Sequence, residues 1–356
     1  MRTTPLFGVP FFLFLSACSG IPGLWATYSH PCSGNRTDTL WFDSDGQTGW
    51  VGCGSTTSGY GLFYTTNGGR SWSAPTTDPA GYFSGFRVDS VSRSSDGMLY
   101  VGGTGSGDRV VQVDTSSSPM KVTPVFSSMG QTWNSFQVGT FRRTSSGLAV
   151  AESLTGVDLV WRADDNDDWH NGYGWWGSND AVQILDMAAV DDQLFGCGSR
   201  ISQPPYVFLP QADASSSSFA FDPVVLDEHV MGEMWGIDAD SSGIVVGGVN
   251  QGTSVGVVFT TSGDGRDPGE WTRTDVSSVV TDTDATWIRG VCRRGQHVVA
   301  VGEYSRRSEG LLIESQDGGA TWSDHTPTGS PTLSRCVILA DDTLTVAGAN
   351  GFFARK

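Results

Sequence analysis

The sequence predicts an all-β fold, and three periodic observations carry this prediction. The first is a turn motif that occurs twice in the 356 residues, as "TTNGGRSW" at 65–72 and as "SQDGGATW" at 315–322. In both copies Asn-Gly-Gly or Asp-Gly-Gly lies between an apolar run and a Trp. Asn-Gly and Asp-Gly after an apolar run are strong signals for a β-hairpin. Each copy therefore predicts two antiparallel strands joined by a tight turn.

The second observation is the spacing of the tryptophans that follow such turns. Trp72, Trp169, Trp271 and Trp322 are separated by 97, 102 and 51 residues, which correspond to two, two and one periods. One further step towards the N-terminus reaches Trp25. A repeat of about 50 residues is typical of stacked or circular repeat architectures. The chain offers seven places for it.

The third observation is an apolar run that ends in small residues and recurs once in every unit. The seven copies are "GWVGCG" (49–54), "LYVGGT" (99–104), "LAVAES" (148–153), "LFGCGS" (194–199), "IVVGGV" (244–249), "VAVGEY" (299–304) and "LTVAGA" (344–349). A polar turn usually precedes each copy, and another apolar run follows it. One unit thus reads as four strands, which is the pattern of a β-propeller blade. We predict one domain, a seven-bladed β-propeller of four-stranded blades; a sandwich or an open solenoid is the alternative.

The two ends of the chain predict how the ring closes. The last unit stops at "GFFARK" (351–356), which reads as a third strand, so its fourth strand is missing. Residues 25–30 read as a fourth strand with no unit before it. Pairing these two segments removes the exposed strand edges that an open ring would have. We therefore expect the last blade to be closed by an N-terminal strand.

The Gly-Gly turns resemble Asp-box, or BNR, repeats. These repeats occur in sialidases, in sortilin-type receptors and in the photosystem II stability/assembly factor and its bacterial relatives. Seven units and an N-terminal closing strand are more similar to the assembly-factor type than to the six-bladed sialidases. The resemblance implies that Asp317 and Asn67 are structural turn residues that lie away from any active site.

The first residues predict export. "MRTTPLFGVPFFLFLSACSG" (1–20) has one Arg, then an apolar stretch that is too short to span a bilayer, then Leu-Ser-Ala-Cys. This ending resembles the bacterial lipobox, which implies a lipidated Cys18 and, with Ser19 after it, the outer membrane or cell surface. An ordinary signal peptide with an incidental Cys is the alternative. The predicted organisation is a lipoprotein signal peptide at 1–17, a lipidated tether at 18–24 and one β-propeller domain at 25–356.

Charge limits the partners. The chain has 21 Lys and Arg against 38 Asp and Glu, a formal net charge of −17. Such a protein does not attract nucleic acid electrostatically. The one acidic cluster, Asp164–Asp168, has part of the spacing of a calcium loop, but Trp169 replaces the expected Gly, so a degenerate turn is favoured over a metal site. No cofactor fingerprint is found, and we expect no metal, no cofactor and a monomer.

Five cysteines remain after Cys18, so an exported form has at least one unpaired thiol. Cys32 leaves the closing strand and Cys53 ends a second strand, which places both on one face of neighbouring blades. We predict a disulfide between them. A bond between Cys292 and Cys336, on inner strands of adjacent blades, is the second candidate.

The function classes left open are a binding protein and an enzyme. The seven Glu, the five His and the absence of a recognisable sialidase motif favour a non-enzymatic binding or assembly scaffold, with a sialidase-type glycosidase as the alternative. Aromatic residues and arginines between units, or at the starts of inner strands, are expected on one face around the channel mouth. There they would bind a protein or glycan, or they would plug the channel. The candidate residues are Trp133, Tyr173, Trp175, Trp176, Trp235, Trp287, Arg87, Arg289 and Arg335.

Overall fold

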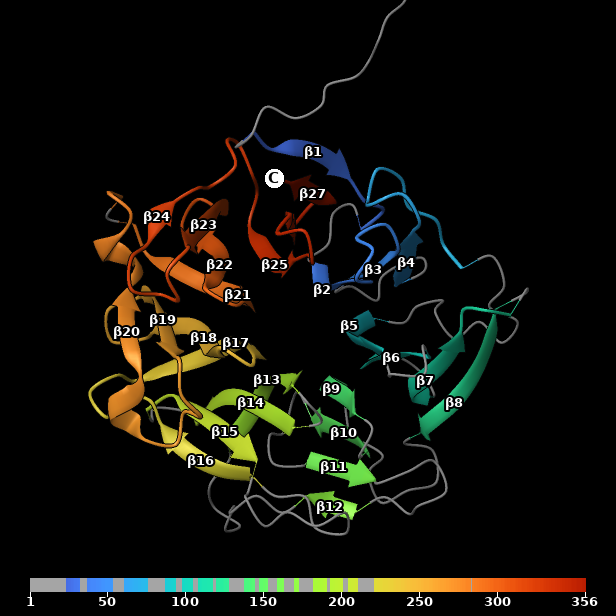
Figure 1. Cartoon of the computed structure of the whole chain (residues 1–356), viewed down its shortest axis with the longest axis horizontal. Helices are drawn as coiled ribbons and strands as arrows, with labels where there is room; N and C mark the ends of the chain where they lie inside the picture. The colour runs from blue at the N-terminus through green and yellow to red at the C-terminus, as the bar shows by residue number, and fades with distance from the viewer. Residues whose placement is uncertain are drawn as a thin grey trace, which may run out of the picture.

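The structure, a computed structural model, is a ring of β-sheets around a central channel (Figure 1). It describes residues 24–32, 37–53, 61–75, 87–93, 98–104, 108–117, 120–127, 138–144, 147–152, 159–162, 170–172, 182–190, 193–200, 204–210, 221–282 and 284–356. Within these residues the regular structure consists of strands and two short 3-10 turns, η1 (Pro268–Glu270) and η2 (Val276–Ser278). The all-β prediction is confirmed. Helices of the length and apolar character that a membrane crossing requires are absent from the described part of the chain.

Each sheet contributes one strand to the wall of the channel (Figure 1). These inner strands are β2 (Thr37–Phe42), β5 (Arg87–Arg93), β9 (Val138–Thr144), β13 (Val182–Val190), β17 (Gly232–Asp240), β21 (Thr286–Arg294) and β25 (Leu333–Ile338). The second strands are β3 (Gly49–Cys53), β6 (Leu99–Thr104), β10 (Gly147–Glu152), β14 (Gln193–Arg200), β18 (Gly243–Asn250), β22 (His297–Tyr304) and β26 (Leu344–Gly348). They cover all or most of each of the seven runs that end in small residues.

The outer strands follow in the same order. The third strands are β4 (Leu62–Thr65), β7 (Asp108–Asp114), β11 (Leu159–Arg162), β15 (Tyr206–Pro210), β19 (Val255–Thr261), β23 (Glu309–Ser315) and β27 (Phe352–Arg355). The fourth strands are β8 (Lys121–Ser127), β12 (His170–Gly172), β16 (Phe221–Val225), β20 (Thr272–Asp275), β24 (Ser323–Asp324) and β1 (Ala26–Ser29).

The ring closes through its two chain ends, as the sequence predicts. β1 pairs antiparallel with β27, with Ala26 opposite Arg355 and Ser29 opposite Phe352. The two strands lie side by side at the outer edge of the last blade (Figure 1). The sheet β1-β27-β26-β25 thus joins the first described strand to the last three.

The prediction of seven four-stranded blades is wrong. Among the described residues six blades have four strands, whereas the sheet β2-β3-β4 has three and ends in a single bridge between Tyr64 and Ser73. The blade β21-β22-β23-β24 carries the second Gly-Gly turn and can be compared residue by residue. Its fourth strand continues one hydrogen bond further, because the His325 amide donates to Leu312 O at 3.0 Å. The residue in the same place is Pro75, which has no N–H to donate. Among the described residues, the fourth strand of this blade is therefore reduced to the Tyr64–Ser73 bridge.

The core lies between neighbouring blades, where the second strand of one sheet packs against the inner strand of the next. The small residues of the second strands make this packing possible. A Cβ at Gly247 would lie 2.5 Å from Cγ2 of Ile288 on the next blade. This close approach explains why the recurring apolar runs end in small residues.

The two Gly-Gly turns have matching hydrogen bonds. Asp317 Oδ1 accepts from the Thr321 amide at 2.8 Å, and Asn67 Oδ1 accepts from the Ser71 amide at 3.0 Å. Hydrogen bonds from the Thr321 hydroxyl and amide lower the pKa of Asp317 to about 2. Each turn also packs on its own blade, since the amides of Gly68 and Gly318 donate to the turn between the first two strands. We call this side of the ring the turn face and the opposite side the mouth face.

The described residues contain two disulfides, and they join the two cysteine pairs that are predicted from the sequence. Cys32 and Cys53 have Cα atoms 5.3 Å apart, and Cys292 and Cys336 have Cα atoms 5.8 Å apart. Cys197 keeps a buried thiol that contacts Met234 O at 3.4 Å. The predicted signal peptide, Cys18 and the Asp164–Asp168 cluster lie outside the described residues.

Candidate functional site at the channel mouth

A β-bulge recurs near the beginning of every inner strand. In each case the pairing with the second strand skips one residue. A bulge bends its strand and turns a side chain in a new direction. The skipped residues therefore occupy equivalent positions around the ring. They are Asp38, Asp89, Gly139, Leu185, Trp235, Arg289 and Ser334.

Two of these bulge residues meet a third predicted site residue. The guanidinium carbon of Arg289 lies 4.5 Å from the ring centre of Trp235 and 4.6 Å from that of Trp287. The two indole rings are 5.6 Å apart and inclined by 62°. A guanidinium over aromatic faces is attracted by the ring quadrupoles. We call Trp235, Trp287 and Arg289 the mouth cluster.

Two glutamates fix the mouth cluster in position. Glu303 accepts from Arg289 Nη2 at 2.6 Å and from the Thr332 hydroxyl at 2.7 Å. Glu233 accepts from Trp235 Nε1 at 3.0 Å and from the Gln251 side chain at 2.9 Å. The side chains of Arg289 and Glu303 are 21% and 11% exposed. The cluster is therefore a rigid aromatic surface that solvent partly reaches.

An exposed apolar side chain lies beside the cluster. Met231 is 47% exposed, and its carbonyl accepts from the amide of Gln251. Gln251 in turn bonds Glu233. Among the described residues Met231 and Leu24 are the exposed large hydrophobic side chains. Met, Trp and Arg together are the residue types that are enriched at protein interfaces.

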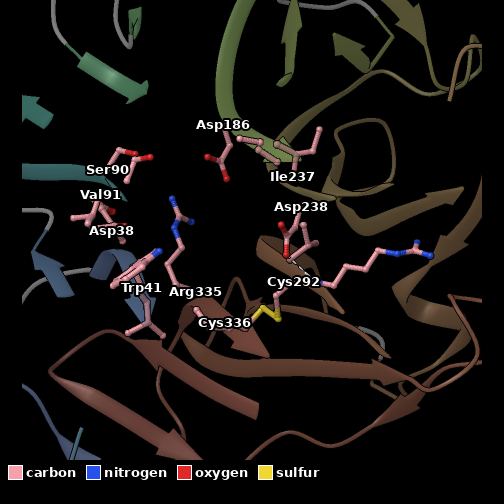
Figure 2. A pocket seen from close by; sticks show the side chains of 18 of the residues that line it. Asp38, Trp41, Ser90, Val91, Asp186, Ile237, Asp238, Cys292, Arg335 and Cys336 are labelled. Atoms are coloured by element: carbon pink, nitrogen blue, oxygen red, sulfur yellow. Dashed lines mark hydrogen bonds between the residues drawn. A yellow bond between two sulfur atoms is a disulfide. The ribbon is translucent and has the colours of Figure 1, made fainter. Parts of the chain in front are cut away.

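The structure connects a fourth predicted residue to the cluster and separates a fifth from it. Arg335 Nη1 donates to Arg289 O at 2.9 Å, and its side chain enters the channel (Figure 2). Arg87 lies on β5 and forms ion pairs with Asp89 at 2.5 Å and Asp38 at 3.4 Å. The predicted residues Trp133, Tyr173, Trp175 and Trp176 lie outside the described residues.

A cavity of about 340 Å³ lies in the channel, among residues of β2, β5, β13, β17, β21 and β25. Asp38, Asp186 and Asp238 line it together with Ser90 and Arg335 (Figure 2). Other lining arginines are used structurally. Arg93 pairs with Asp43, and the Arg293 side chain is 1% exposed and donates to Ser242 O at 2.7 Å. Burial lowers the pKa of Arg293, against the opposing effect of Asp240 and Asp238.

The glutamates that hold the cluster and the acidic residues of the channel are not among the residues predicted from the sequence. A signal was available for the acids. Asp89 in "RVDSVSR" (87–93) and Asp186 in "VQILDMAAV" (182–190) interrupt strands that are otherwise largely apolar or small. No such signal marks Glu233 and Glu303, because their role depends on which bulge residue faces them.

Comparison with known proteins places the chain by fold. No protein-family model matches the chain, and no curated protein matches it. Several solved structures do. A structure of "YCF48 bound to D1 peptide" has a TM-score of 0.65 and 14% identity, and the match covers 93% of this chain and 94% of that one. YCF48 from Cyanidioschyzon merolae has a TM-score of 0.63 and 14% identity, with coverages of 93% and 98%.

A streptogramin B lyase structure has a TM-score of 0.61 and 9% identity, with coverages of 93% and 96%. At these identities the matches show the fold alone. A β-propeller of this shape therefore occurs both in YCF48 and in an enzyme. The chain is a β-propeller with YCF48 among its structural neighbours.

Proposed function

We propose that this protein is a non-enzymatic binding or assembly scaffold that holds a protein partner on its mouth face. The observation that carries the proposal is the convergence of Trp235, Trp287 and Arg289 on that face. These three residues come from two adjacent blades, so the folded ring assembles them. The partner would contact the two indole rings and the neighbouring Met231.

The mouth cluster has the physical character of a binding anchor. Large aromatic side chains contribute much contact area, and those already fixed in position lose little entropy on binding. Here Glu233 holds Trp235, and Glu303 holds the guanidinium between the rings. Truncating a central Trp or Arg anchor to Ala can weaken binding by about 2 kcal/mol or more.

The fold comparison supports a protein partner. A propeller of similar shape, YCF48, has been solved with a D1 peptide bound. In this chain the N-terminal strand β1 closes the ring by pairing with β27. By analogy with that neighbour, the proposed partner of this chain is a polypeptide.

The arrangement of the arginines supports a scaffold over the sialidase-type alternative. Such an enzyme needs several arginines that converge on one substrate carboxylate. Here Arg87 pairs with Asp89, Arg289 pairs with Glu303, and Arg335 bonds backbone carbonyls. Arg87 and Arg289 are thus neutralised by carboxylates of the protein itself, so the three guanidinium groups do not share one acceptor.

We further propose that a lipid on Cys18 attaches the ring to the bacterial outer membrane or cell surface. Support comes from the Leu-Ser-Ala-Cys sequence and from the direction of β1. β1 begins opposite Arg355, and Arg355 Nη1 donates to Gly68 O and Gly46 O on the turn face. Seven residues span about 25 Å at most, so the turn face would lie near the membrane. The mouth face would point away from it.

Site-directed photo-crosslinking in the native host tests the binding proposal. A photoreactive phenylalanine analogue replaces Met231 on the mouth face or, as the matched control, the exposed Ala320 on the turn face. We expect a discrete protein adduct at position 231 that disappears when Trp235 and Trp287 are both Ala. Equal adducts at both positions, or an adduct that survives the double substitution, would contradict the proposal.

The anchor has a separate test. Metabolic labelling with a palmitate analogue should label the wild-type protein and should not label the Cys18→Ser variant. Labelling that persists in Cys18→Ser would reject lipidation at this residue and leave the mouth-face proposal intact.

A further inference from the structure

The cavity inside the channel is a second candidate site, separate from the mouth cluster. Its volume of about 340 Å³ is at the lower end of the range of about 300–1,000 Å³ that small-molecule pockets occupy. Its wall carries hydroxyl groups of Thr39, Ser90 and Ser92 as well as charged side chains. A small polar molecule fits this wall better than an apolar one.

Arg335 gives the cavity a positioned set of donors. Figure 2 shows the side chain reaching from β25 into the cavity, towards Ser90 and Asp186. Nη1 is held at 2.9 Å from both Arg289 O and Ser334 O. In the described part of the chain, the Arg335 side chain donates to these two carbonyls, and both bonds come from Nη1. The N–H groups of Nε and Nη2 can therefore donate to another acceptor. A carboxylate is the acceptor that matches a guanidinium edge.

The backbone beside Arg335 is fixed by covalent bonds. Cys336 is bonded to Cys292 on the neighbouring inner strand, and both cysteines line the cavity (Figure 2). A donor that is held in place before binding loses little entropy when a ligand arrives. The guanidinium is therefore preorganised for an acceptor in the channel.

Carboxylates of other strands face the same space. Asp186 comes from β13 and Asp238 from β17, and both are labelled around the cavity in Figure 2. Asp238 Oδ2 accepts the Arg293 amide at 2.8 Å, and Asp186 Oδ1 accepts the Met187 amide at 2.9 Å. A carboxylate oxygen has two lone pairs, so one backbone N–H does not exhaust its capacity to accept hydrogen bonds.

We propose that the channel cavity binds a small polar amino acid as its zwitterion. The ligand carboxylate would bind Arg335, and the ligand ammonium group would bind the side of Asp186 and Asp238. A simple anion would meet the nearby aspartates, and a simple cation would leave the donors of Arg335 unused. A zwitterion satisfies both parts of the wall. This proposal does not depend on the mouth-face proposal.

Isothermal titration of the whole protein with three matched probes tests it. L-glutamine carries both charges, 4-carbamoylbutanoate lacks the ammonium group, and 4-aminobutanamide lacks the carboxylate. We expect L-glutamine to bind with a one-to-one stoichiometry. Each of the other two should bind at least about tenfold more weakly, since a charged hydrogen bond is lost.

Variants locate the site. Arg335→Gln should weaken L-glutamine binding at least about tenfold, whereas Arg93→Gln, the matched control at a lining arginine paired with Asp43, should change it less than about twofold. Trp235→Ala with Trp287→Ala should leave L-glutamine binding unchanged and so separates this site from the mouth cluster.

Three results would overturn the proposal. They are the lack of saturable L-glutamine binding, equal binding of either single-charge probe, and unchanged binding in Arg335→Gln. If Arg335→Gln does not fold, the comparison of the three probes on the unmodified protein still decides.

Discussion

The seam that closes the ring should weaken in acid because it contains a buried neutral histidine. His30 follows β1 and is 4% exposed, and its amide donates to Gly351 O. The Cys32 amide donates to Nδ1 at 3.2 Å, so Nδ1 is an acceptor. The Thr37 hydroxyl donates to Gly348 O at 2.8 Å, so Nε2–H donates to Thr37 Oγ1 at 2.9 Å. This arrangement needs the uncharged ring.

The magnitude follows from the pKa. Burial lowers the pKa of His30 from 6.5 to about 4, despite opposing backbone hydrogen bonds. Between these values the unfolded chain binds a proton that the folded chain excludes, so stability falls as the pH falls. One pKa unit corresponds to about 1.4 kcal/mol, which gives a loss of about 3 kcal/mol between pH 7.5 and pH 4.

Urea unfolding of the wild type and of His30→Gln at several pH values measures this loss. Gln cannot take up the proton, so the variant should be less stable at pH 7.5 but should lack this part of the decline. The difference between the two proteins should therefore shrink by about 3 kcal/mol on acidification. Parallel curves for the two proteins would refute the assignment.

Three further predictions concern the blades next to the seam. His297 lies 2.7 Å from Asp342 and 3.1 Å from Glu314, and although burial lowers its pKa, these carboxylates raise it above 6.5. The stabilisation is present below pH 6.5 and is lost as the pH rises through the folded pKa. His297→Gln should therefore cost about 2 kcal/mol in urea unfolding at pH 6 and less at pH 9, and a cost independent of pH would be inconsistent with the ion pairs. The Cys292–Cys336 disulfide closes a loop of 44 residues in the unfolded chain, so replacing both cysteines by Ser should lower the free energy of unfolding by about 4 kcal/mol. A loss below about 1 kcal/mol would show that the disulfide does not stabilise the fold by restricting the unfolded chain. Pro75→Ala restores an amide opposite Leu62, and hydrogen exchange at residue 75 should then be slow; exchange at the rate of an exposed loop would show that Pro75 does not end the strand.

The sequence was sufficient to predict the ring and its closure because both follow from local patterns. Gly-Gly turns and runs ending in small residues repeat at a constant spacing, and each has a local physical cause. Gly68 and Gly69 have φ angles of +70° and +83°, and Gly247 leaves room for Ile288. Residues 25–30 could be placed because the last unit lacks a fourth strand.

The short fourth strand that the described part of the first blade shows could have been predicted from one residue. Pro75 lies where the matching blade has His325, whose amide makes the last ladder bond. The repeat is marked by its Trp and Gly residues, and the lack of an amide at position 75 does not disturb that pattern. A period gives the number of units, but individual residues decide how many strands each unit completes.

The candidate site was predictable only in part. Trp235, Trp287 and Arg289 could be named because they lie near the starts of inner strands. Their contact depends on bulges in two separate sheets, and no local signal marks a bulge here. Asp186 and Asp238 come from the inner strands β13 and β17 of adjacent blades, so they line one cavity only because the ring places these strands side by side (Figure 2).

The affinity of the mouth face for its protein partner tests the central claim most directly. The partner identified by crosslinking at position 231 would be purified and titrated against the wild type and against Trp235→Ala with Trp287→Ala. Melting curves would verify that the variant remains folded. The account predicts that the double substitution weakens binding by at least about thirtyfold, because two anchors are removed. Equal affinity of the folded variant and the wild type would contradict it.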